Sequence, residues 1–514
     1  MESGTRNTNM EPATSVIAAE CVESPLILSI DIGTSAVKIL IFDCRGRAVE
    51  GFQWRGGFDV RTDTDGASEV DPDALLQVVW QGIDAVLNKA KAGPLATEIA
   101  GVACCTFVGN IMGVNRSEKP VTPLFTYADT RAETAVGWLQ AEFDQKEVHD
   151  RTGCHFHSSY LPARFRWLGQ TQPDLIRRVE RWLSIGEYLE LKLFGQTSVS
   201  YSVASWSGLL NRHQLVWDDQ LLQKLPVDIS QLSPLVDLDF PKRGLSHDFA
   251  SRWPLLGRLP WFPASGDGAA ANIGSGCISP SHVALTMGTT SAMRAVVDRA
   301  IEQVPAGLWC YRVDRHRSLP GGALSEGGSL FSWMTQTLRL EDPSGLDAAL
   351  KGLRPDGHGL TLLPFLSGER SPGWQGKARA AINGISQATT PLEIIHAGME
   401  SVAYRIALVF KRLSKLLPGE VQVIAGGGAL RGSPAWAQII CDVMNRPIAV
   451  ADIPEATARG TALLALEALG VIENLSDIPI IIEHTCNPDA ARHAIYQRAL
   501  ERHQKLYQKL VEEM

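Results

Sequence analysis

The chain of 514 residues has no apolar run of about 18 residues that could cross a membrane. Its polar N-terminus, MESGTRNTNMEPATSVIAAECVES, lacks the hydrophobic stretch of a secretory signal. It has no dense basic block either, since 48 Lys and Arg stand against 56 Asp and Glu. The nine cysteines are an odd number and are scattered, which favours reduced thiols over a disulfide framework. These absences predict a cytoplasmic protein that binds neither nucleic acid nor membrane.

Two common nucleotide-binding patterns are also missing. The pattern G-x-x-x-x-G-K-[ST] does not occur, and the glycine run that starts at Gly426 fails G-x-G-x-x-G because Arg431 occupies its last position. The stretch ASGDGAAANIG matches a relaxed form of the dinucleotide pattern, but the expected acidic residue about 20 positions later is lacking. A Walker loop is excluded, and a nicotinamide-dependent dehydrogenase is a weak alternative.

The composition and length predict more than one folded domain. The chain is 45% hydrophobic and 20% charged, which is typical of globular proteins, and it exceeds the roughly 150 residues of an ordinary domain. Helical patterns over residues 72–92, 391–416, 434–443 and 457–469 alternate with strand-like runs such as 421–425. This alternation indicates α/β layers. We predict a disordered leader over 1–24 and two domains over 25–270 and 271–514, with the proline-rich segment 232–263 as the join.

Two similar segments lie almost half the chain apart. SIDIGTSAVKILIF, from Ser29, aligns with ALTMGTTSAMRAVV, from Ala284, when Gly33 is set on Gly288. Each predicts a β-hairpin whose tip carries glycine and hydroxyl groups, although Gly-Thr is also a common hairpin turn. Only the first segment has a carboxylate, Asp31, at the position of Thr286 in the second. That asymmetry fits two tips that share one phosphate chain and one metal ion.

Asp267 stands between two glycines just before the second segment. Such an aspartate is often an Asx-turn residue. It is equally suited to accept a proton from a substrate hydroxyl while a phosphoryl group leaves a nucleotide. The glycine run at 426–428 follows a strand-like stretch and precedes a helix that starts near Ser433. There the backbone could approach a base or a phosphate closely.

Other polar segments have both a functional and a structural interpretation. Asp129 and Arg131, in TYADTRAET, are either substrate ligands or the start of an exposed helix. Glu369, Arg370 and Trp374 form either a cleft wall or a salt-bridged turn. In TGCHFH a zinc site is not expected, because no second pair of ligands has suitable spacing, and hydrogen bonds from His157 near a polar ligand are the better hypothesis.

Taken together, SIDIGTSAVKILIFD, ASGDGAAANIG, LTMGTTSAM and GGGALRGSPAWAQIICDVMNRPI resemble the two phosphate motifs, the catalytic aspartate segment and the adenosine motif of the FGGY family of carbohydrate kinases. The resemblance covers about residues 26–470. It implies an α/β fold of two actin/hexokinase-like (ribonuclease H-like) domains with an interdomain cleft. It also implies ATP-dependent phosphorylation of a small sugar or sugar acid, with ATP and Mg²⁺ as cofactors.

The resemblance implies a role for each matching residue. Asp31 would reach Mg²⁺, which reconciles its carboxylate with the nearby phosphates. Asp267 would be the general base. The phosphates would face Gly33, Thr34, Ser35 and Lys38 of the first domain and Gly288, Thr289 and Thr290 of the second. The adenosine would be framed by Gly426, Gly427, Gly428, Ser433 and Gln438. The substrate would contact Thr106, Asp129, Arg131, His157 and Asp267.

Within the family, segments such as TYADTRAET and LPFLSGERSPGW are similar to those of gluconate kinases. The chain departs from them at Gly109-Asn110, where His-Ser is frequent, and at Tyr127, where Trp is common. We expect D-gluconate to be phosphorylated to 6-phosphogluconate, with Arg131, Arg164 or Arg370 binding the carboxylate. The alternatives are a pentulose or polyol (xylulose, ribulose, erythritol) and a non-catalytic actin-like nucleotide-binding protein. A homodimer is compatible with the resemblance.

Overall fold

The computed structural model describes residues 14–91, 93–340 and 345–513. Two mixed β-sheets organise it, and each contains one of the predicted hairpins. The first sheet has the order β1 (Val16–Ile17), β4 (Ala48–Gly57), β3 (Ala36–Phe42), β2 (Leu26–Ile32), β7 (Ile99–Thr106) and β15 (Ser265–Gly266). The second has the order β18 (Trp309–Arg312), β19 (Ser318–Leu324), β17 (Ser291–Ala295), β16 (His282–Met287), β22 (Gln422–Gly426), β23 (Ile448–Ala451) and β24 (Ile482–Cys486).

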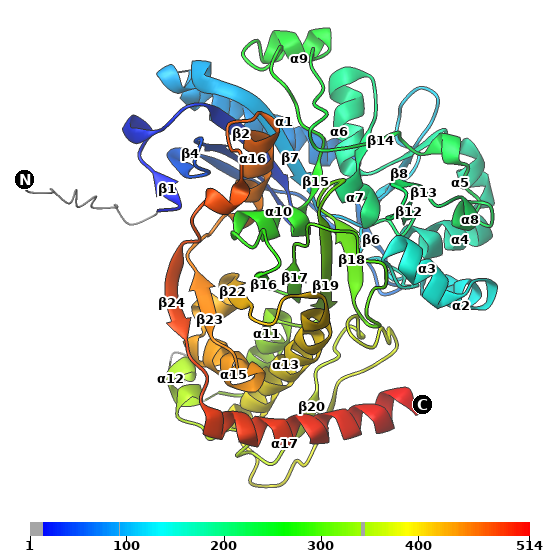
Figure 1. Cartoon of the computed structure of the whole chain (residues 1–514). Helices are drawn as coiled ribbons and strands as arrows, with labels where there is room; N and C mark the ends of the chain where they lie inside the picture. The colour runs from blue at the N-terminus through cyan, green and yellow to red at the C-terminus, as the bar shows by residue number, and fades with distance from the viewer. Residues whose placement is uncertain (1–13, 92, 341–344, 514) are drawn as a thin grey trace, which may run out of the picture.

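The two sheets repeat one topology, which confirms the predicted two-domain α/β fold. In each, an antiparallel hairpin (β2–β3 or β16–β17) is followed by a parallel strand beside its first strand (β7 or β22). Figure 1 shows the first sheet in the upper half of the molecule and the second sheet in the lower half. The aligned segments of the sequence therefore occupy matching positions in two separate sheets.

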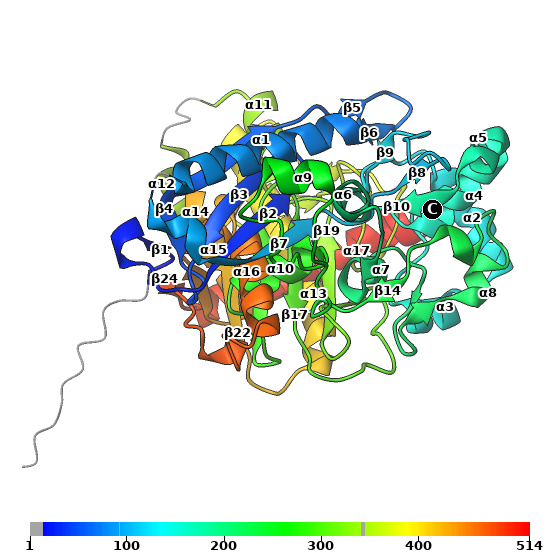
Figure 2. The same cartoon turned by 90° about the horizontal axis from the view of Figure 1, so that it is seen from above.

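The remaining strands form smaller sheets. They comprise β5 (Arg61–Thr62), β6 (Ser68–Val70) and β9 (Leu124–Phe125); β8 (Met112–Val114) with β10 (Arg181–Leu183); β11 (Val199–Ser200) with β14 (Leu235–Val236); β12 (Leu210–Asn211) with β13 (Val216–Trp217); and β20 (Thr361–Leu363) with β21 (Ala381–Asn383). Most of these pairs belong to the insertions of the first domain. Helices α2, α3, α4, α5 and α8 gather with them at one end of the molecule (Figure 2).

The helices begin where the sequence offers capping groups. Asp71 accepts hydrogen bonds from the backbone N–H groups of Asp73 (2.9 Å) and Ala74 (3.0 Å), and Thr390 forms a capping box with Glu393. The helices are α1 (Pro72–Ala90), α2 (Glu133–Glu142), α3 (Gln145–Thr152), α4 (Leu161–Thr171), α5 (Pro173–Arg178), α6 (Ile185–Phe194), α7 (Tyr201–Ser205), α8 (Asp219–Leu222), α9 (His247–Arg252), α10 (Asp267–Gly274), α11 (Gly328–Thr337), α12 (Leu346–Lys351), α13 (Pro391–Leu413), α14 (Gly428–Gly432), α15 (Pro434–Met444), α16 (Ala456–Ala468) and α17 (Ala490–Tyr507). The four predicted helical windows correspond to α1, α13, α15 and α16.

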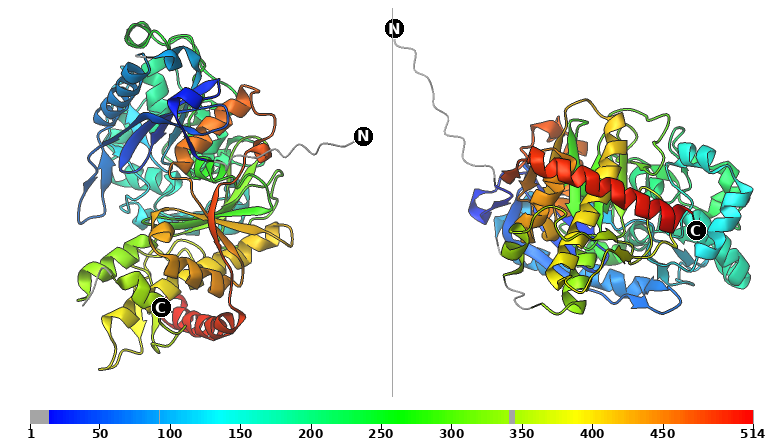
Figure 3. Two further views of the ribbon diagram at one scale, coloured as in Figure 1. Left: turned by 90° about the vertical axis from the view of Figure 1, so that its left-hand side faces the viewer. Right: turned by 90° about the horizontal axis from the view of Figure 1, so that it is seen from below.

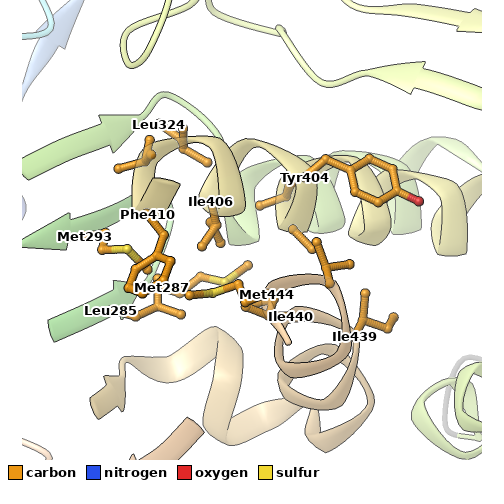
Figure 4. Packing of buried hydrophobic residues seen from close by; sticks show 14 of the residues in the cluster. Leu285, Met287, Met293, Leu324, Tyr404, Ile406, Phe410, Ile439, Ile440 and Met444 are labelled. Carbon is orange, nitrogen blue, oxygen red and sulfur yellow. The ribbon is translucent and has the colours of Figure 1, made fainter. Parts of the chain in front are cut away.

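Each sheet is covered by amphipathic helices that bury one face. Helix α1 packs on β3 and β4, while α13 and α15 pack together beside the second sheet. In the second core, Phe410 of α13 gathers with Met287 and Met293 of the hairpin strands and Met444 of α15 (Figure 4). Helix α17 runs across the far face of this domain (Figure 3). The hairpin tips are thus carried on well-packed strands.

The predicted domain boundary does not match the packing of helices α10 and α16, which lie against each other and against strands of the first sheet. The boundary between residues 270 and 271 falls inside α10, and α16 packs on β2 and β7 of the first sheet. The crossing is close, because a Cβ added at Gly274 would lie 1.7 Å from the Ala456 carbonyl oxygen. A Cβ added at Gly460 would lie 1.8 Å from the Ala270 carbonyl oxygen. Larger residues at these two glycines would force the helices apart.

Two sequence predictions, about the leader and about the join between the domains, are wrong. The leader is ordered from residue 14 onward: Val16–Ile17 pairs with β4, and Glu23 forms an ion pair with Arg47 at 2.9 Å. Residues 1–13 lie outside the described residues. The segment 232–263, predicted as the join, belongs to the first core, where Trp253 packs against Trp80 with ring centroids 5.5 Å apart. This proline-rich segment packs with α1 in the first core and is not a boundary between domains.

Candidate functional site

A cavity of about 290 Å³ collects side chains from both domains. The tip of the first hairpin contributes Thr34, the second hairpin contributes Thr286 and Thr290, and α10 contributes Asp267. The remaining lining residues are Val108, Gly109, Tyr127, Ser159, Tyr160, Trp206, Gly268, Ala271, Ala292, Arg294, Trp309, Tyr311, Ala323, Arg370, Trp374 and Thr457. One cavity therefore joins parts of both predicted phosphate motifs with the predicted general base.

Asp267 is the first residue of α10, immediately after β15. Its Oδ1 accepts a hydrogen bond from the Gly268 N–H at 2.7 Å. Burial raises the pKa of Asp267 to about 6; nearby Arg294 lowers it and the negative charge of Asp31 raises it. A carboxylate with this pKa is mostly ionised at neutral pH and is a stronger base than an exposed aspartate.

Asp31 lies near the end of β2 and is only 4% exposed. Burial raises its pKa to about 6, and the positive charge of Lys38 opposes that effect. The Lys38 Nζ lies 3.9 Å from the Asp31 Oδ2 and 2.7 Å from the Glu455 Oε2. The Cys105 Sγ donates to the Asp31 Oδ1 at 3.4 Å. Lys38 therefore supplies positive charge between two carboxylates.

These side chains fit the donor set of a magnesium site. Mg²⁺ is bound by one or two carboxylates together with phosphate and water oxygens. Asp31 and Glu455 supply the carboxylates, and Thr34 and Ser35 place hydroxyls on the exposed tip beside them. Glu455, which begins the stretch EATARGTALLA, was not singled out from the sequence. Its signal is only spatial, since it meets Lys38 across the domain interface.

Each hairpin tip is closed by a backbone hydrogen bond from its glycine. The Gly33 N–H donates to the Ala36 carbonyl at 3.0 Å, and the Gly288 N–H donates to the Thr290 carbonyl at 3.0 Å. The second tip is also held by α11, whose Ser329 N–H donates to the Thr289 carbonyl at 3.0 Å. The exposed tips leave hydroxyl groups free to meet a ligand, as the sequence pattern predicts.

The glycine run at 426–428 turns the chain from β22 into α14. Gly427 has φ +101°, and a Cβ there would lie 2.3 Å from the Met287 carbonyl oxygen, so its conformation explains that glycine. Added Cβ atoms at Gly426 and Gly428 would meet no atom within 4 Å. The backbone at these two positions is open, which suits the predicted adenosine site.

Ser433 and Gln438, also predicted to frame the adenosine, have partners within the protein. The Ser433 hydroxyl donates to the Asp347 Oδ1 at 2.7 Å. The Gln438 Nε2 donates to the Asp442 Oδ1 at 2.8 Å and to the Asn487 carbonyl at 2.9 Å. Both side chains thus stabilise the ends of neighbouring elements in this structure.

The structure does not bring Asp129 and Arg131 into the cavity. The Arg131 Nη2 lies 2.5 Å from the Asp129 Oδ2 and 2.6 Å from the Glu69 Oε1. The fully buried Arg164 approaches the same Asp129 oxygen at 3.3 Å. Because these charges neutralise one another, neither Arg131 nor Arg164 is available to a substrate carboxylate, in contrast to the sequence prediction.

Two further predicted substrate ligands also lie outside the lining. Thr106 ends β7, is fully buried, and its Oγ1 has no partner among the described residues. The His157 Nδ1 is 2.7 Å from the Ser159 hydroxyl, and its ring meets the edge of Trp374 with centroids 5.5 Å apart. His157 therefore supports the cavity wall, and Ser159 and Trp374 form the wall itself.

Aromatic side chains from both domains build that wall, which the sequence did not reveal. The hydroxyls of Tyr160 and Tyr311 lie 2.5 Å apart and link the two domains. Tyr311 stacks on Trp206 with ring centroids 3.7 Å apart. Thirteen scattered Trp gave no sign of this arrangement, because residues far apart in the chain meet only after folding.

The departure at Gly109-Asn110 has a structural explanation. Gly109 has φ +68°, and a Cβ there would lie 3.0 Å from the Tyr127 Cβ. The Asn110 Oδ1 accepts from the Ile185 N–H at 2.8 Å, and its Nδ2 donates to the Phe107 carbonyl. Gly109 therefore leaves space beside Tyr127, and Asn110 holds the start of α6.

Within the described part of the chain, one group of histidine and acidic side chains is close enough to hold a metal ion, away from the cavity. The ligand atoms of His358, His396 and Glu400 lie within 4.8 Å of one another. However, the His358 Nδ1 accepts from the Leu360 N–H at 2.9 Å, which leaves the ring proton on Nε2, directed at Glu400 (3.0 Å). This tautomer favours a hydrogen-bonded network over a metal site.

No helix among the described residues is both long and apolar enough to cross a bilayer. Residues 26–274 match the FGGY family of carbohydrate kinases, N-terminal domain, and residues 283–469 match its C-terminal domain. The chain is similar to a gluconokinase of Bacillus subtilis (strain 168), with 26% identity over 481 residues that cover 91% of this chain and 93% of the relative. It is similar to a xylulose kinase of Escherichia coli (strain K12), with 24% identity over 500 residues that cover 95% and 99%. The crystal structure of gluconate kinase from Lactobacillus acidophilus matches with a TM-score of 0.87 and 25% identity, covering 94% of this chain and 98% of that one.

Proposed function

Because this chain belongs to the FGGY family of carbohydrate kinases, and is thus an ATP-dependent kinase of sugars or polyols, we propose that its substrate is D-gluconate and its product 6-phosphogluconate. One observation carries this proposal. The cavity that contains Asp267 also contains Arg294 and Arg370, and among the described residues neither arginine forms an ion pair within 4.0 Å, although Asp267 lies near Arg294 and Glu326 lies near Arg370. Two cations without a close ion pair in a sugar cavity favour an anionic substrate.

Arg370 is the better partner for the substrate carboxylate. Its Nη2 donates to the Leu324 carbonyl at 2.9 Å, which leaves other N–H groups for a ligand. Burial raises the pKa of Tyr127 and of Tyr160, and the charge of Arg370 opposes that rise, which places Arg370 at the aromatic part of the cavity. A guanidinium there can bind a carboxylate through two parallel hydrogen bonds, while the far end of the sugar acid meets Asp267.

In the reaction, the terminal hydroxyl of gluconate lies against Asp267, which accepts its proton as the new O–P bond forms. An ordinary alcohol is far too weak an acid to lose its proton to this carboxylate in advance, so the transfer is late. Bound Mg²⁺ and ATP supply charge neutralisation and the phosphoryl group. Asp31 and Glu455 would hold the ion, the two hairpin tips would orient the phosphates, and the aromatic wall would exclude water.

The relatives leave a neutral pentulose as the main rival. The similar proteins include both a gluconokinase and a xylulose kinase, at 26% and 24% identity. A pentulose has no negative charge to match Arg370, so the two arginines without a close ion pair favour the sugar acid.

The experiment is ADP release with ATP and Mg²⁺ in the presence of gluconate, glucitol, xylulose, ribulose, glycerol or erythritol. Glucitol is the sharpest control, because it replaces the carboxylate of gluconate with a neutral CH₂OH group. We expect selective turnover of gluconate. The Arg370→Met variant should raise KM for gluconate about 10- to 100-fold, as expected for a lost charged hydrogen bond. The exposed Arg116 provides the matched control, and Arg116→Met should change nothing. Faster turnover of xylulose or ribulose than of gluconate would reject the proposed substrate and leave the kinase assignment intact.

A further inference from the structure

Arg294 is a positive charge beside the predicted base, and its anionic neighbour is Asp267 itself, with no ion pair within 4.0 Å between the two described residues. Its side chain lines the cavity from β17, and its Nη1 donates to the Thr286 Oγ1 at a long 3.4 Å. Its Nε is buried and has no hydrogen-bond partner among the described residues. An unsatisfied buried donor of a charged group is costly unless a ligand completes it.

Other buried arginines of the described chain have protein groups close to their charge, although the Nε atoms of Arg164 and Arg405, like that of Arg294, have no hydrogen-bond partner among the described residues. Arg164 approaches Asp129 at 3.3 Å, and Arg405 forms an ion pair with Glu369. Arg459 donates to the carbonyl oxygens of Gly46 (3.0 Å) and Gly274 (2.6 Å). Arg294 differs from them because it lines the cavity, and its hydrogen bond to the Thr286 hydroxyl is long, at 3.4 Å. Its remaining N–H groups are therefore open to a ligand in the cavity.

The guanidinium points toward the reacting end of the cavity. Thr286 pairs with Ala292 in the hairpin ladder, nearer to the tip than Arg294 itself, so the side chain reaches back toward the phosphate-binding turn. On its other side, the Arg294 Nε lies 3.3 Å from where a Cβ would stand at Gly268. The charge thus lies between the second hairpin tip and the start of α10, where Asp267 is located.

Gly268 makes this position accessible. A Cβ at residue 268 would lie 2.8 Å from the Trp206 Cη2 and 3.3 Å from the Arg294 Nε. Any side chain there would push the guanidinium or the indole out of place. Glycine at position 268, next to Asp267, therefore leaves the space that the Arg294 guanidinium occupies.

We propose that Arg294 is a catalytic residue that donates hydrogen bonds to the substrate oxygen under attack and to the phosphoryl group that it receives. The inference rests on the proposed phosphoryl transfer with Asp267 as the base. In that step the hydroxyl oxygen forms its bond to phosphorus, the bond from phosphorus to the ADP oxygen breaks, and the hydroxyl proton moves to the Asp267 carboxylate. Arg294 remains protonated throughout and meets the negative charge that these changes concentrate between the two domains.

The main test compares Arg294→Met and Arg294→Lys with wild type, using gluconate and the neutral glucitol. We expect Arg294→Met to lower kcat by about 10²- to 10³-fold for each substrate that wild type turns over, with KM changed by less than about threefold. Arg294→Lys keeps the charge but loses the planar fork, and it should retain more activity. Adding guanidinium ion at millimolar concentration to Arg294→Ala should restore part of the lost kcat.

The pH profile gives a readout that a purely structural role would not change. The titratable and charged groups around Asp267 are Arg294 on β17, Asp31 on the first hairpin, Cys105 on β7 and Tyr127, together with the Gly268 N–H on its own helix. Because Arg294 lowers the pKa of Asp267, Arg294→Met should shift the acidic limb of kcat/KM to higher pH. Gly268→Ala should also lower kcat, because the added methyl group would displace the guanidinium of Arg294.

Two results would overturn the proposal. One is a rise in KM for gluconate alone with kcat unchanged, because that pattern identifies a ligand of the substrate carboxylate. The other is an unchanged kcat for every substrate. MgADP binding and the melting temperature show whether each variant is folded. If Arg294→Met does not fold, Arg294→Lys serves as the test. If wild type turns over xylulose and not gluconate, the same variants are measured with xylulose. The proposed sugar and the proposed role of Arg294 are then tested independently of each other.

Discussion

The two hairpins share a backbone and differ in the charges they carry. Both close on a Gly-Thr tip and both precede a parallel strand, β7 or β22. The first presents Asp31 and Lys38, which suit a metal ion and phosphate oxygens. The second presents Thr286 at the position of Asp31, and Arg294 further along its second strand. The repeat thus provides two similar frames, and under the proposed mechanism the first would serve the cation and the second the reacting end of the sugar.

Asp267 lies where the two hairpins converge, so its substitution has the largest expected effect. Asp267→Asn should lower kcat by about 10²- to 10⁴-fold, the range for a positioned general base, while MgADP binding persists. ADP release and calorimetric binding of MgADP measure the two quantities. Retention of more than a tenth of the wild-type kcat would remove Asp267 from the proton transfer.

The same variant should be more stable than wild type. The folded pKa of Asp267, about 6, exceeds its ordinary value of 3.8, so the folded state holds the proton more tightly than the unfolded state. This contribution to stability is complete below pH 3.8 and is lost as the pH rises to about 6. At pH 7.5 Asp267→Asn therefore relieves a cost of about 1–3 kcal/mol. Urea unfolding at pH 7.5 and pH 4 should show the gain at the higher pH only; a gain of equal size at both would contradict the account.

Exchange of the matching positions tests the asymmetry directly. Asp31→Asn should reduce kcat/KM by about 10²- to 10³-fold and weaken the dependence on Mg²⁺, because the carboxylate that would hold the ion is gone. Thr286→Val should cost less than about tenfold, since only a weak contact to Arg294 is lost. Initial rates across a Mg²⁺ titration compare the two variants. Equal effects would show that the hairpins are not specialised.

The pH dependence of the wild type should report the converged carboxylates. Burial raises the pKa of both Asp267 and Asp31 to about 6, with each carboxylate near the other. Below that pH the base is protonated, so log kcat/KM should fall with a slope of at least one per pH unit. A rate profile from pH 5 to 9 measures this limb. A flat profile down to pH 5 would mean that no such group titrates in the free enzyme.

Glu455 should have the smallest effect of the series. It contacts Lys38 at 2.7 Å from the opposite side to Asp31, and both partners are partly exposed. Glu455→Gln should raise KM for MgATP by about tenfold or less, because Lys38 loses one of its two positioning carboxylates. Glu473 is an exposed acidic residue beyond α16 and offers a matched control. A loss as large as that of Asp31→Asn would make Glu455 an equal partner at the metal.

The sequence predicted the sheets better than it predicted the substrate cavity. The hairpins, α1, α13, α15 and α16 follow from local periodicity and capping, so their positions could be read from neighbouring residues. The cavity depends on contacts between residues far apart in the chain. Arg294 was not singled out from the sequence, because the residues next to it in the chain do not indicate that Gly268 leaves room for its guanidinium.

The sequence expectations differ from the structure where a local residue pattern fits two structural interpretations. Asp129 and Arg131 were expected to contact the substrate because of the family resemblance, while their own pattern also fitted a helix start; in the structure they form ion pairs with each other and with Glu69 and Arg164. The segment 232–263 was taken as a join because of its prolines, yet its Trp residues fill the first core. In both cases the partners come from distant parts of the chain, which a single sequence does not specify.

The most direct test of the central claim is the position of the new phosphate. The account places the carboxylate of gluconate at Arg370 and its terminal hydroxyl at Asp267. After the reaction of gluconate, ATP and Mg²⁺, the proton-coupled phosphorus NMR spectrum should therefore show a phosphomonoester split by the two protons of a CH₂ group, as in 6-phosphogluconate. A signal split by a single proton, from a secondary hydroxyl, or inorganic phosphate as the only product, would contradict this orientation and the proposed function with it.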